Sequence, residues 1–282
     1  MNAVETRLDN LRSQQPEWAP WLAVVEAVLR EVIDNKWDAA VPMAPAAPAS
    51  KVPLLTEATI ELRNNLVRRW FARLIGVASR SGTEALATLA PALTADLNIS
   101  SLFKVALQQD SDQLKGMAAA LGVDGEAFGA VMALLPAPFL QSCNRRWTPS
   151  VAAPWTEGYC PICGAWPAFA EVRGIERLQF LRCGRCGSGW QTQCLFCPFC
   201  GVTDHEAMVS LVPENSTLNS VIGACKRCLG YVKTFTKLQG CPPAEVILED
   251  LASVALDMAA AERGYKRPQG AGYMLNVEVR AK

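Results

Sequence analysis

The first 150 residues alternate between apolar and polar positions with the period of amphipathic helices. In TEATIELRNNLVRRWFARLIGVASRSG, large apolar residues recur every three or four positions. This spacing predicts a helix that starts at Thr56 and ends at Gly82. Similar patterns predict three further helices: Trp18 to Val32, Leu102 to Leu121, and Phe128 to Cys143. The simplest interpretation is a helical bundle whose apolar stripes form its core.

Proline-rich stretches separate these helices from one another and from the rest of the chain. The segment VPMAPAAPASKVP, residues 41–53, carries four prolines and predicts an exposed connection. Further prolines up to Pro154 interrupt the helical pattern before cysteine-rich chain begins at Tyr159, so we place a boundary near residue 155. Residues 244–268 predict a C-terminal helix that ends near Gly264 and packs back onto an earlier part.

The cysteines lie almost entirely in one third of the chain. Ten of the eleven lie between Cys160 and Cys241, and only Cys143 precedes them. The N-terminus MNAVETRLDN is polar and acidic, and no uninterrupted apolar run approaches the roughly eighteen residues that would span a bilayer. An odd number of cysteines in a chain without an export signal favours reduced thiols over disulfides. We therefore expect a cytoplasmic protein.

Eight of these cysteines form two tandem blocks of paired Cys-x-x-Cys motifs. In the first block nineteen residues separate the pairs, and in the second twenty-four. Such spacing is typical of sites in which four thiolates surround one metal ion. The predicted ligands are Cys160, Cys163, Cys183 and Cys186 in the first block, and Cys197, Cys200, Cys225 and Cys228 in the second.

The residues around the motifs predict rubredoxin-like or zinc-ribbon modules. Glycine follows three of the four motifs and allows a tight turn with positive φ, whereas Leu229 follows the fourth, which predicts a less typical turn. Between the first two motifs, AWPAFAEVRGIERLQFLR alternates around Gly174 as a β-hairpin does. Cys194 precedes CPFCG without a partner and is a spare thiol, as is Cys241.

Other interpretations of the cysteines stay open. The stretch CLFCPFC, from Cys194 to Cys200, with the remote pair Cys241-Pro242 resembles the ligand arrangement of a bacterial four-iron cluster. That assignment leaves two of the second block's cysteines unexplained. Cys194 and Cys241 are also candidates for a redox pair. Closed four-thiolate sites argue against a zinc hydrolase, and thiolate ligands do not distinguish zinc from iron.

The charge of the chain argues against a nucleic-acid partner. The whole sequence has 27 basic and 27 acidic side chains. From Trp155 to Glu245 there are eight basic and seven acidic residues, and each divalent ion with four thiolates adds about two negative charges. The net charge of this region, about −3, is the wrong sign for a protein that binds phosphates.

The cysteine-rich region resembles the formate dehydrogenase accessory proteins of the FdhE type. The resemblance rests on YCPICG, RCGRCGSGW, CPFCG, CKRCLGYVKTF and EDLASVALDMAAAERGYKR, within residues 159–267. It implies a helical N-terminal domain, two rubredoxin-like modules, each with one iron or zinc ion, and the metal cysteines named above. It also implies a cytoplasmic protein that assists maturation of the formate dehydrogenase catalytic subunit. The chain departs from the family at Cys194, where relatives have a basic residue, and at Gln191, where they often have histidine.

We therefore expect an α+β protein of four parts: a helical domain (1–155), a first (156–191) and a second (192–242) four-cysteine module, and a C-terminal helix and tail (243–282). We expect it to be an accessory protein rather than an enzyme, without insertion into a membrane, and a homodimer is left open. The alternatives are an iron-containing redox protein acting on an oxidoreductase and, third, a zinc-ribbon nucleic-acid-binding protein.

Overall fold

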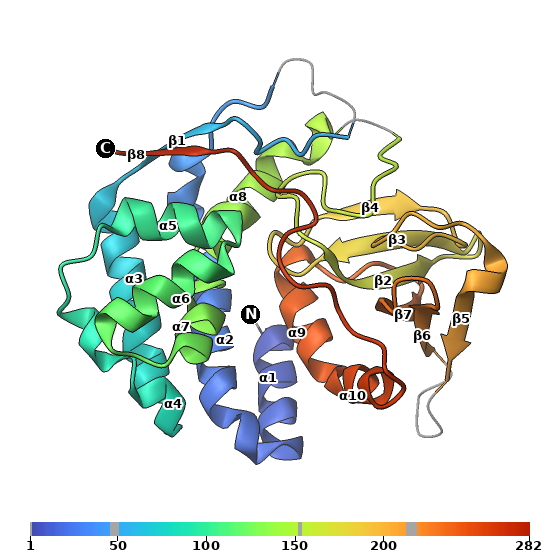
Figure 1. Ribbon diagram of the computed structural model, residues 1–282, viewed down its shortest axis with the longest axis horizontal. Helices are drawn as coiled ribbons and strands as arrows, with labels where there is room; N and C mark the ends of the chain where they lie inside the picture. The colour runs from blue at the N-terminus through green and yellow to red at the C-terminus, as the bar shows by residue number, and fades with distance from the viewer. Residues whose placement is uncertain (1, 46–50, 152–153, 213–218) are drawn as a thin grey trace. The chain divides into compact units, whose positions relative to one another are not determined.

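The computed structural model describes residues 2–45, 51–151, 154–212 and 219–282 (Figure 1). Two compact units are each assembled from segments that are distant in the sequence. The helical unit comprises Met1–Met43, Thr56–Arg146 and Asn276–Lys282, and the cysteine-rich unit comprises Ala44–Leu55 and Trp147–Leu275. This arrangement confirms the predicted α+β class with helices in the N-terminal part. The four-part division at 155, 191 and 242 stays a prediction.

The helical unit contains eight α-helices and a two-stranded sheet among the described residues. Its elements are α1 (Asn2–Gln14), α2 (Ala19–Val32), β1 (Thr59–Leu62), α3 (Asn64–Ser79), α4 (Glu84–Ala87), α5 (Ile99–Gln108), α6 (Ser111–Leu121), α7 (Gly125–Met132), α8 (Ala137–Trp147) and β8 (Glu278–Ala281). Aromatic side chains fill the centre: the Phe103 ring lies 6.4 Å from that of Trp37 and 5.9 Å from that of Phe139. The Trp70 indole N–H donates to the Leu135 carbonyl, so this buried polar group is satisfied.

The prediction that a helix starts at Thr56 is wrong. Ile60 and Leu62 lie in β1, which pairs in parallel with β8 at the C-terminal end of the chain. Helix α3 begins only at Asn64. Alternate residues of β1 are buried, so the same apolar residues fit a strand once a partner strand is present.

Two other predicted helices are each interrupted once. Gln109 takes a left-handed conformation that ends α5, and the Asp110 side chain accepts the Gln113 N–H at the start of α6. The pattern from Phe128 to Cys143 divides at Pro136 into α7 and α8. Cys143 is fully buried on α8, as a small apolar residue would be.

The cysteine-rich unit is built on one six-stranded sheet, with strands in the order β4-β3-β2-β7-β6-β5 (Figure 1). The strands are β2 (Pro167–Arg173), β3 (Leu178–Cys183), β4 (Gly189–Thr192), β5 (Met208–Leu211), β6 (Ser220–Cys225) and β7 (Tyr231–Lys237). β2 to β4 form one antiparallel meander and β5 to β7 another. The two meanders join through the parallel pair β2–β7. The predicted hairpin at Gly174, which has a φ of 65°, is confirmed.

The C-terminal helical segment packs on this sheet, and it is broken in two: α9 (Val246–Ala252) and α10 (Val254–Glu262). The Ser253 hydroxyl at the break donates to the Glu249 and Asp250 carbonyls, a bond that competes with regular helix. Val246 and Leu256 share a buried cluster with Phe169 of β2 and Phe235 of β7. The helices therefore cover the strands that join the two meanders.

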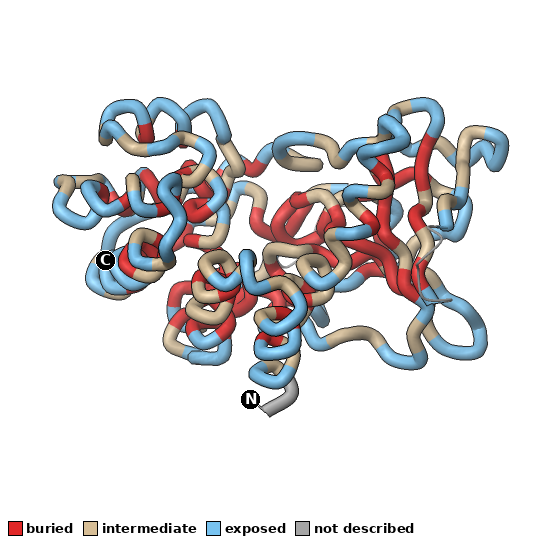
Figure 2. Tube along the Cα trace, turned by 90° about the horizontal axis from the view of Figure 1, so that it is seen from below, coloured by how far each residue is buried: buried red, intermediate tan, exposed pale blue. Residues whose placement is uncertain are grey.

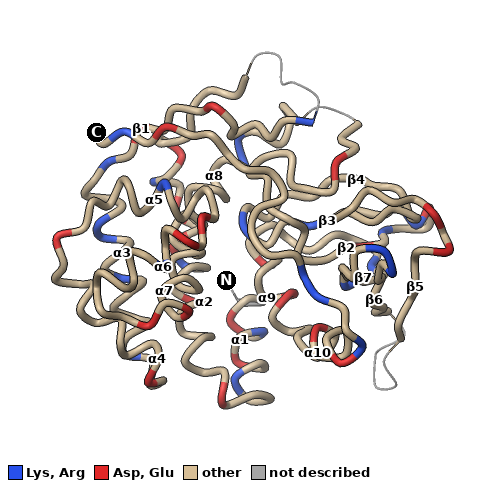
Figure 3. Tube along the Cα trace, in the orientation of Figure 1, with Lys and Arg blue, Asp and Glu red and all other residues tan. Residues whose placement is uncertain are grey.

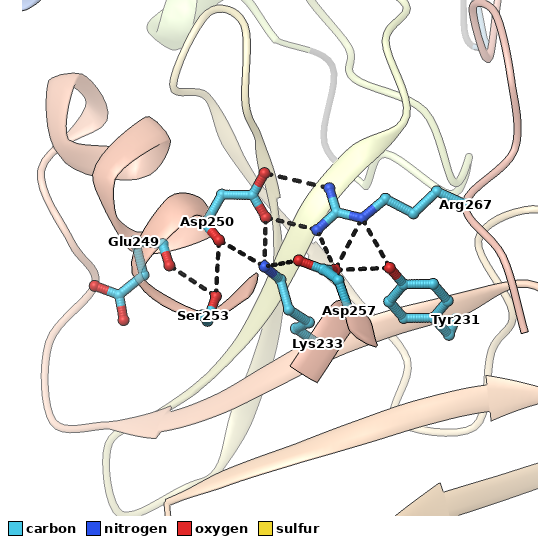
Figure 4. Close-up of polar contacts among 7 residues, drawn as sticks. All are labelled: Tyr231, Lys233, Glu249, Asp250, Ser253, Asp257 and Arg267. Atoms are coloured by element: carbon cyan, nitrogen blue, oxygen red, sulfur yellow. Dashed lines mark hydrogen bonds and ion pairs between the residues drawn. The ribbon is translucent and has the colours of Figure 1, made fainter. Parts of the chain in front are cut away.

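An ion network holds the same helices to β7 (Figure 4). The Lys233 side chain is fully buried, and its Nζ lies 2.7 Å from a carboxylate oxygen of Asp250 and 2.8 Å from one of Asp257. Arg267 contacts both carboxylates, at 2.6 and 2.8 Å, and the Tyr231 hydroxyl donates to Asp257. Two cations face two anions, so the buried charges are paired. Each member comes from β7 or from the chain after it.

The connection at residues 41–53 lies only partly within the described residues, since 46–50 are outside them. Its described part forms no regular element, but the expectation that it is exposed is wrong at its end, where Pro53 is buried. The backbone N–H groups of Leu54 and Leu55 donate to the carbonyls of Pro161 and Ile162 in the first cysteine motif. This segment is thus part of the cysteine-rich unit.

The buried positions of the helices and strands are mostly apolar, and neither unit is dominated by one sign of charge. Figure 2 shows buried positions in the helices of the helical unit and along the central sheet of the cysteine-rich unit. Basic and acidic residues are present together in both units (Figure 3). Within the described part of the chain, no helix is long and apolar enough to cross a membrane.

Candidate metal centres

The four Cys-x-x-Cys motifs fold into the same turn. In each motif, the N–H of the first cysteine donates to the carbonyl five residues later, at 2.8–2.9 Å. The N–H of the residue after the second cysteine donates back to the carbonyl of the first cysteine, at 2.9–3.0 Å. These two bonds hold both sulfurs of a motif on one side of the turn, where they face a second motif.

The residue that follows each motif has a positive φ in all four turns. It is Gly164, Gly187 and Gly201 in three of them, with φ values of 68°, 75° and 73°. In the fourth, Leu229 has a φ of 57°, which is unfavourable for a residue with a side chain. The expectation of a less typical fourth turn is wrong in its backbone, because Leu229 adopts the glycine conformation.

The first cysteine group brings together the two motifs that flank the β2–β3 hairpin. The Sγ atoms of Cys160 and Cys186 lie 3.4 Å apart, and those of Cys163 and Cys183 lie 3.5 Å apart. All four sulfurs lie within 4.8 Å of one another. Disulfide sulfurs would lie about 2.05 Å apart, so these are separate thiols gathered around one point.

The second cysteine group repeats this arrangement with the motifs that flank the antiparallel pair β5–β6. The Sγ atoms of Cys197 and Cys228 lie 3.6 Å apart, and those of Cys200 and Cys225 lie 3.8 Å apart. These four sulfurs are also within 4.8 Å of one another. A tetrahedral ion with metal–sulfur bonds of about 2.3 Å has sulfur–sulfur edges of about 3.8 Å. Both groups therefore have dimensions that could hold a metal ion.

Electrostatics also favours a cation at the first group. All four sulfurs are buried. Burial is the main cause that raises the pKa of Cys160 and Cys186 well above the usual thiol value, whereas at Cys183 burial is outweighed by hydrogen bonds from the neighbouring thiols, which lower its pKa. Four thiolates cannot share a dry site without a compensating positive charge, and a divalent cation supplies it. Backbone N–H groups contribute a smaller stabilisation, as from Ile162 to the Cys160 sulfur at 3.4 Å.

The two groups differ in how the surrounding chain covers them. At the first group, the N–H of Tyr273 donates to the Gly164 carbonyl, and the carbonyl of Pro243 lies against Gly187. At the second, Cys200 and Cys228 reach the surface. A methyl group placed on Gly201 would have no neighbour within 4 Å in the described part of the chain. Distant segments contact both groups, since the Lys266 N–H donates to the Leu229 carbonyl at the second. The groups differ in burial: all four cysteines of the first are buried, and the second is open to solvent on one side.

The two spare thiols have different surroundings. Cys194 is exposed and lies outside both groups. Burial raises the pKa of Cys241 to about 12, and the Glu171 carboxylate adds to the shift. A raised pKa suppresses the reactive thiolate, which disfavours Cys241 as a redox nucleophile. A redox role for the pair stays a prediction.

Sequence patterns gave no indication of the polar cluster beside Cys241. The Glu171 carboxylate is buried and accepts hydrogen bonds from Arg173, Arg182 and the backbone N–H of Cys241. Burial alone would raise the pKa of Glu171, but these partners lower it overall. Glu171 and Arg173 alternate with apolar residues on β2, and only the folded sheet shows which of its polar residues face inward.

The fold and the two cysteine groups define a class: a helical unit followed by two groups of four cysteines on one sheet. Residues 195–275 match the family model "FdhE, C-terminal domain". That segment includes the second cysteine group, β7 and the C-terminal helices. The chain is 33% identical over 115 residues to "Protein FdhE homolog" of Aquifex aeolicus. The alignment covers 39% of this chain and 40% of that protein.

Two further comparisons point the same way. "Protein FdhE homolog" of Pseudomonas aeruginosa is 35% identical over 114 residues, which is 38% of this chain and 37% of that protein. The crystal structure of the FdhE protein from Pseudomonas aeruginosa matches with a TM-score of 0.60 at 22% identity, covering 96% of this chain and 93% of that one. The sequence alignments thus span about two fifths of the relatives' length, and the fold agrees along nearly the whole chain. The predicted resemblance to the FdhE family is confirmed.

Proposed function

We propose that this protein is a formate dehydrogenase accessory protein, which binds the catalytic subunit of formate dehydrogenase in the cytoplasm and is needed for its activity. The match of residues 195–275 to the FdhE C-terminal domain carries the proposal. The role is that of a binding protein rather than an enzyme, and it involves neither nucleic acid nor insertion into a membrane. A homodimer is compatible with it.

Each cysteine group is proposed to hold one ion, iron or zinc. The ligands would be Cys160, Cys163, Cys183 and Cys186 at the first centre, and Cys197, Cys200, Cys225 and Cys228 at the second. The sulfur–sulfur distances of 3.4–3.8 Å support this assignment. The ions would replace apolar core in a small sheet, since four-thiolate ions contribute directly to folding. Residues 156–191 and 192–242 then form the two metal modules.

Binding of the purified catalytic subunit tests the function. We expect the wild-type protein to bind the subunit, and Cys225→Ser to bind it weakly because the second centre lies within the FdhE-type region. Cys194→Ser is the matched control, since this exposed cysteine belongs to neither group. The proposal would be contradicted if the wild-type protein did not bind the subunit. It would also be contradicted if the protein did not restore formate dehydrogenase activity in cells that lack this accessory protein.

The exposure of the second centre favours one alternative function. Since Cys200 and Cys228 reach the surface, an iron ion bound there would be close enough to a docked partner for electron transfer. The protein would then change the redox state of its partner. Anaerobic purification of a colourless, zinc-only protein that shows no redox titration would eliminate this alternative.

A further inference from the structure

The edge strand β4 differs from its counterpart in the second meander. Each meander has a cysteine motif before its first strand and another before its third, so β4 is equivalent to β7. The outer edge of β7 is paired in parallel with β2. The outer edge of β4 has no partner strand in the described part of the chain, because β4 ends the sheet.

The backbone of β4 presents hydrogen-bonding groups at this outer edge. The bond from the Cys183 N–H to the Ser188 carbonyl fixes which residue pairs of β3 and β4 are hydrogen-bonded. Since such pairs alternate along an antiparallel ladder, Trp190 bonds to β3 and Gln191 does not. The N–H and C=O of Gln191 therefore point outward. Counted from the last cysteine of its block, Gln191 is equivalent to Lys233, which lies opposite Phe169 of β2.

A groove of about 770 Å³ runs along this edge, entirely within the cysteine-rich unit. Its walls include Trp155, Trp190 and Phe196, with Gln191, Gln193 and Thr203 as hydrogen-bonding side chains. The described residues that line it carry no charge. A charged side chain of a bound segment would lose its hydration in the groove without finding an opposite charge there. An apolar or neutral side chain does not carry this cost.

The edge strand is short, at four residues, but it lacks the charged residues and prolines that often protect a free strand. Natural edge strands often carry a lysine, an inward-pointing charge or a proline. The sequence of β4 is Gly-Trp-Gln-Thr. Figure 3 accordingly shows β4 without basic or acidic positions.

We propose that the outer edge of β4 binds an extended, uncharged peptide segment of the client protein as a seventh strand. The segment would run parallel to β4, as β2 runs parallel to β7, and would place apolar or aromatic side chains in the groove. This inference deepens the proposed function and rests on it for the identity of the client, the catalytic subunit of formate dehydrogenase.

Overlapping short peptides from the catalytic subunit are the probes, with binding to the metal-loaded, full-length protein measured by fluorescence anisotropy. At least one uncharged peptide should bind. Gln191→Pro removes the outward N–H, which an edge strand tolerates, and should weaken binding about tenfold. Gln191→Ala also removes the groove side chain but keeps the backbone groups, so it is the reference variant: Gln191→Pro should bind about tenfold more weakly than Gln191→Ala. Unchanged thermal unfolding of Gln191→Pro would show that the sheet is intact.

Changes to the peptide and to the groove test the same pairing without touching β4. N-methylation of the bound peptide at successive amides should weaken binding at every second position, as expected for a strand with one edge on β4. Thr203→Trp should block the groove, and Ser210→Trp on the opposite edge strand β5 should not.

Several outcomes would overturn the inference. They are the absence of any binding peptide, equal binding by Gln191→Pro and Gln191→Ala, N-methyl effects without alternation, and self-association of the protein through β4 in sedimentation. Binding of the intact subunit to the wild type, measured in parallel, tests the proposed function separately. If the subunit binds but no peptide does, only the β4 site is wrong.

Discussion

The two cysteine groups have the same turns and nearly the same sulfur–sulfur distances, yet their surroundings differ. Segments at residues 53–55, 243 and 272–273 pack on the turns of the first group, whereas Cys200 and Cys228 of the second reach the surface. The second meander is instead held by the buried ion network of Lys233 and Arg267. A segment at Lys266 also bonds to the turn of the second group, so the difference that remains is exposure: the first group is fully buried and the second is partly open to solvent.

Removing one ligand from each centre should produce the largest effects. Cys183→Ser should lose one ion and unfold much of the cysteine-rich unit, because distant segments pack on the first centre. Cys225→Ser should also lose one ion but lower the unfolding temperature less. A structural zinc ion contributes roughly 10 kcal/mol or more to folding, so both losses should be obvious. Metal content per chain and thermal unfolding are the measurements.

Cys194→Ser is the control for both variants and should keep two ions. If Cys183→Ser and Cys225→Ser keep their full metal content and stability, the ligand assignment is wrong. If Cys225→Ser unfolds more readily than Cys183→Ser, then the second centre, rather than the first, contributes more to the stability of the unit.

Breaking the ion network of the second meander should come next in size. Lys233→Met leaves Asp250 and Asp257 with Arg267 as their remaining cation and should cost about 3–5 kcal/mol in the free energy of unfolding. Lys237→Met, on the same strand, is the matched control. Its partly exposed pair with Glu249, at 2.7 Å, should contribute at most about 1 kcal/mol. Equal losses in urea unfolding would show that the network does not stabilise this meander.

The network also predicts a pH dependence. Burial would raise the pKa of Asp250, but Arg267 and Lys233 lower it below its usual value of 3.8. A lowered pKa gives stability that is present above the unfolded value and lost as the pH falls through the folded value. The difference in stability between the wild type and Asp250→Asn should therefore stay constant from about pH 8 to pH 5. A decrease within that range would contradict the pairing.

Substitution of the turn glycines should separate backbone strain from close packing. Gly201→Ala adds a side chain at positive φ in open space and should cost about 1–2 kcal/mol. In Gly187→Ala the new methyl carbon would lie 2.4 Å from the Pro243 carbonyl oxygen, so overpacking should add about 1–3 kcal/mol. Equal destabilisation of the two variants in urea unfolding would mean that the first centre is not tightly enclosed.

The smallest predicted effect is a gain in stability. Leu229→Gly relieves a positive φ at a residue whose side chain is half exposed, so little packing is lost. The free energy of unfolding should rise by up to about 1 kcal/mol. A loss of stability in the same measurement would show that Leu229 packs more than its exposure suggests.

Local patterns predicted the parts of the structure that local sequence controls. The two groups of four cysteines followed from the spacing of the cysteines, and the β2–β3 hairpin from alternation around Gly174. Ile60 and Leu62 were misassigned because their apolar spacing suits a helix as well as a strand, and only β8 decides between them. The parallel pair β2–β7 likewise had no local signal, since its strands are more than fifty residues apart.

The unequal exposure of the two cysteine groups could not be predicted from the sequence. The motifs CPICG and CPFCG look equivalent, and the segments that pack on the first centre lie more than fifty residues away in the sequence, two of them about a hundred residues away. At Leu229 the sequence predicted a difference that the structure does not have. A leucine in place of glycine suggested a different turn, but the two hydrogen bonds of the motif give it the same backbone conformation as the other three. Contacts across the fold, rather than the motifs themselves, distinguish the centres.

Timed metal release to a chelating dye tests the central claim most directly, that two four-cysteine centres hold metal with unequal accessibility. We predict two phases of equal amplitude, with the faster phase absent from Cys225→Ser and the slower one absent from Cys183→Ser. A single phase, or a faster phase that survives in Cys225→Ser, would contradict the account.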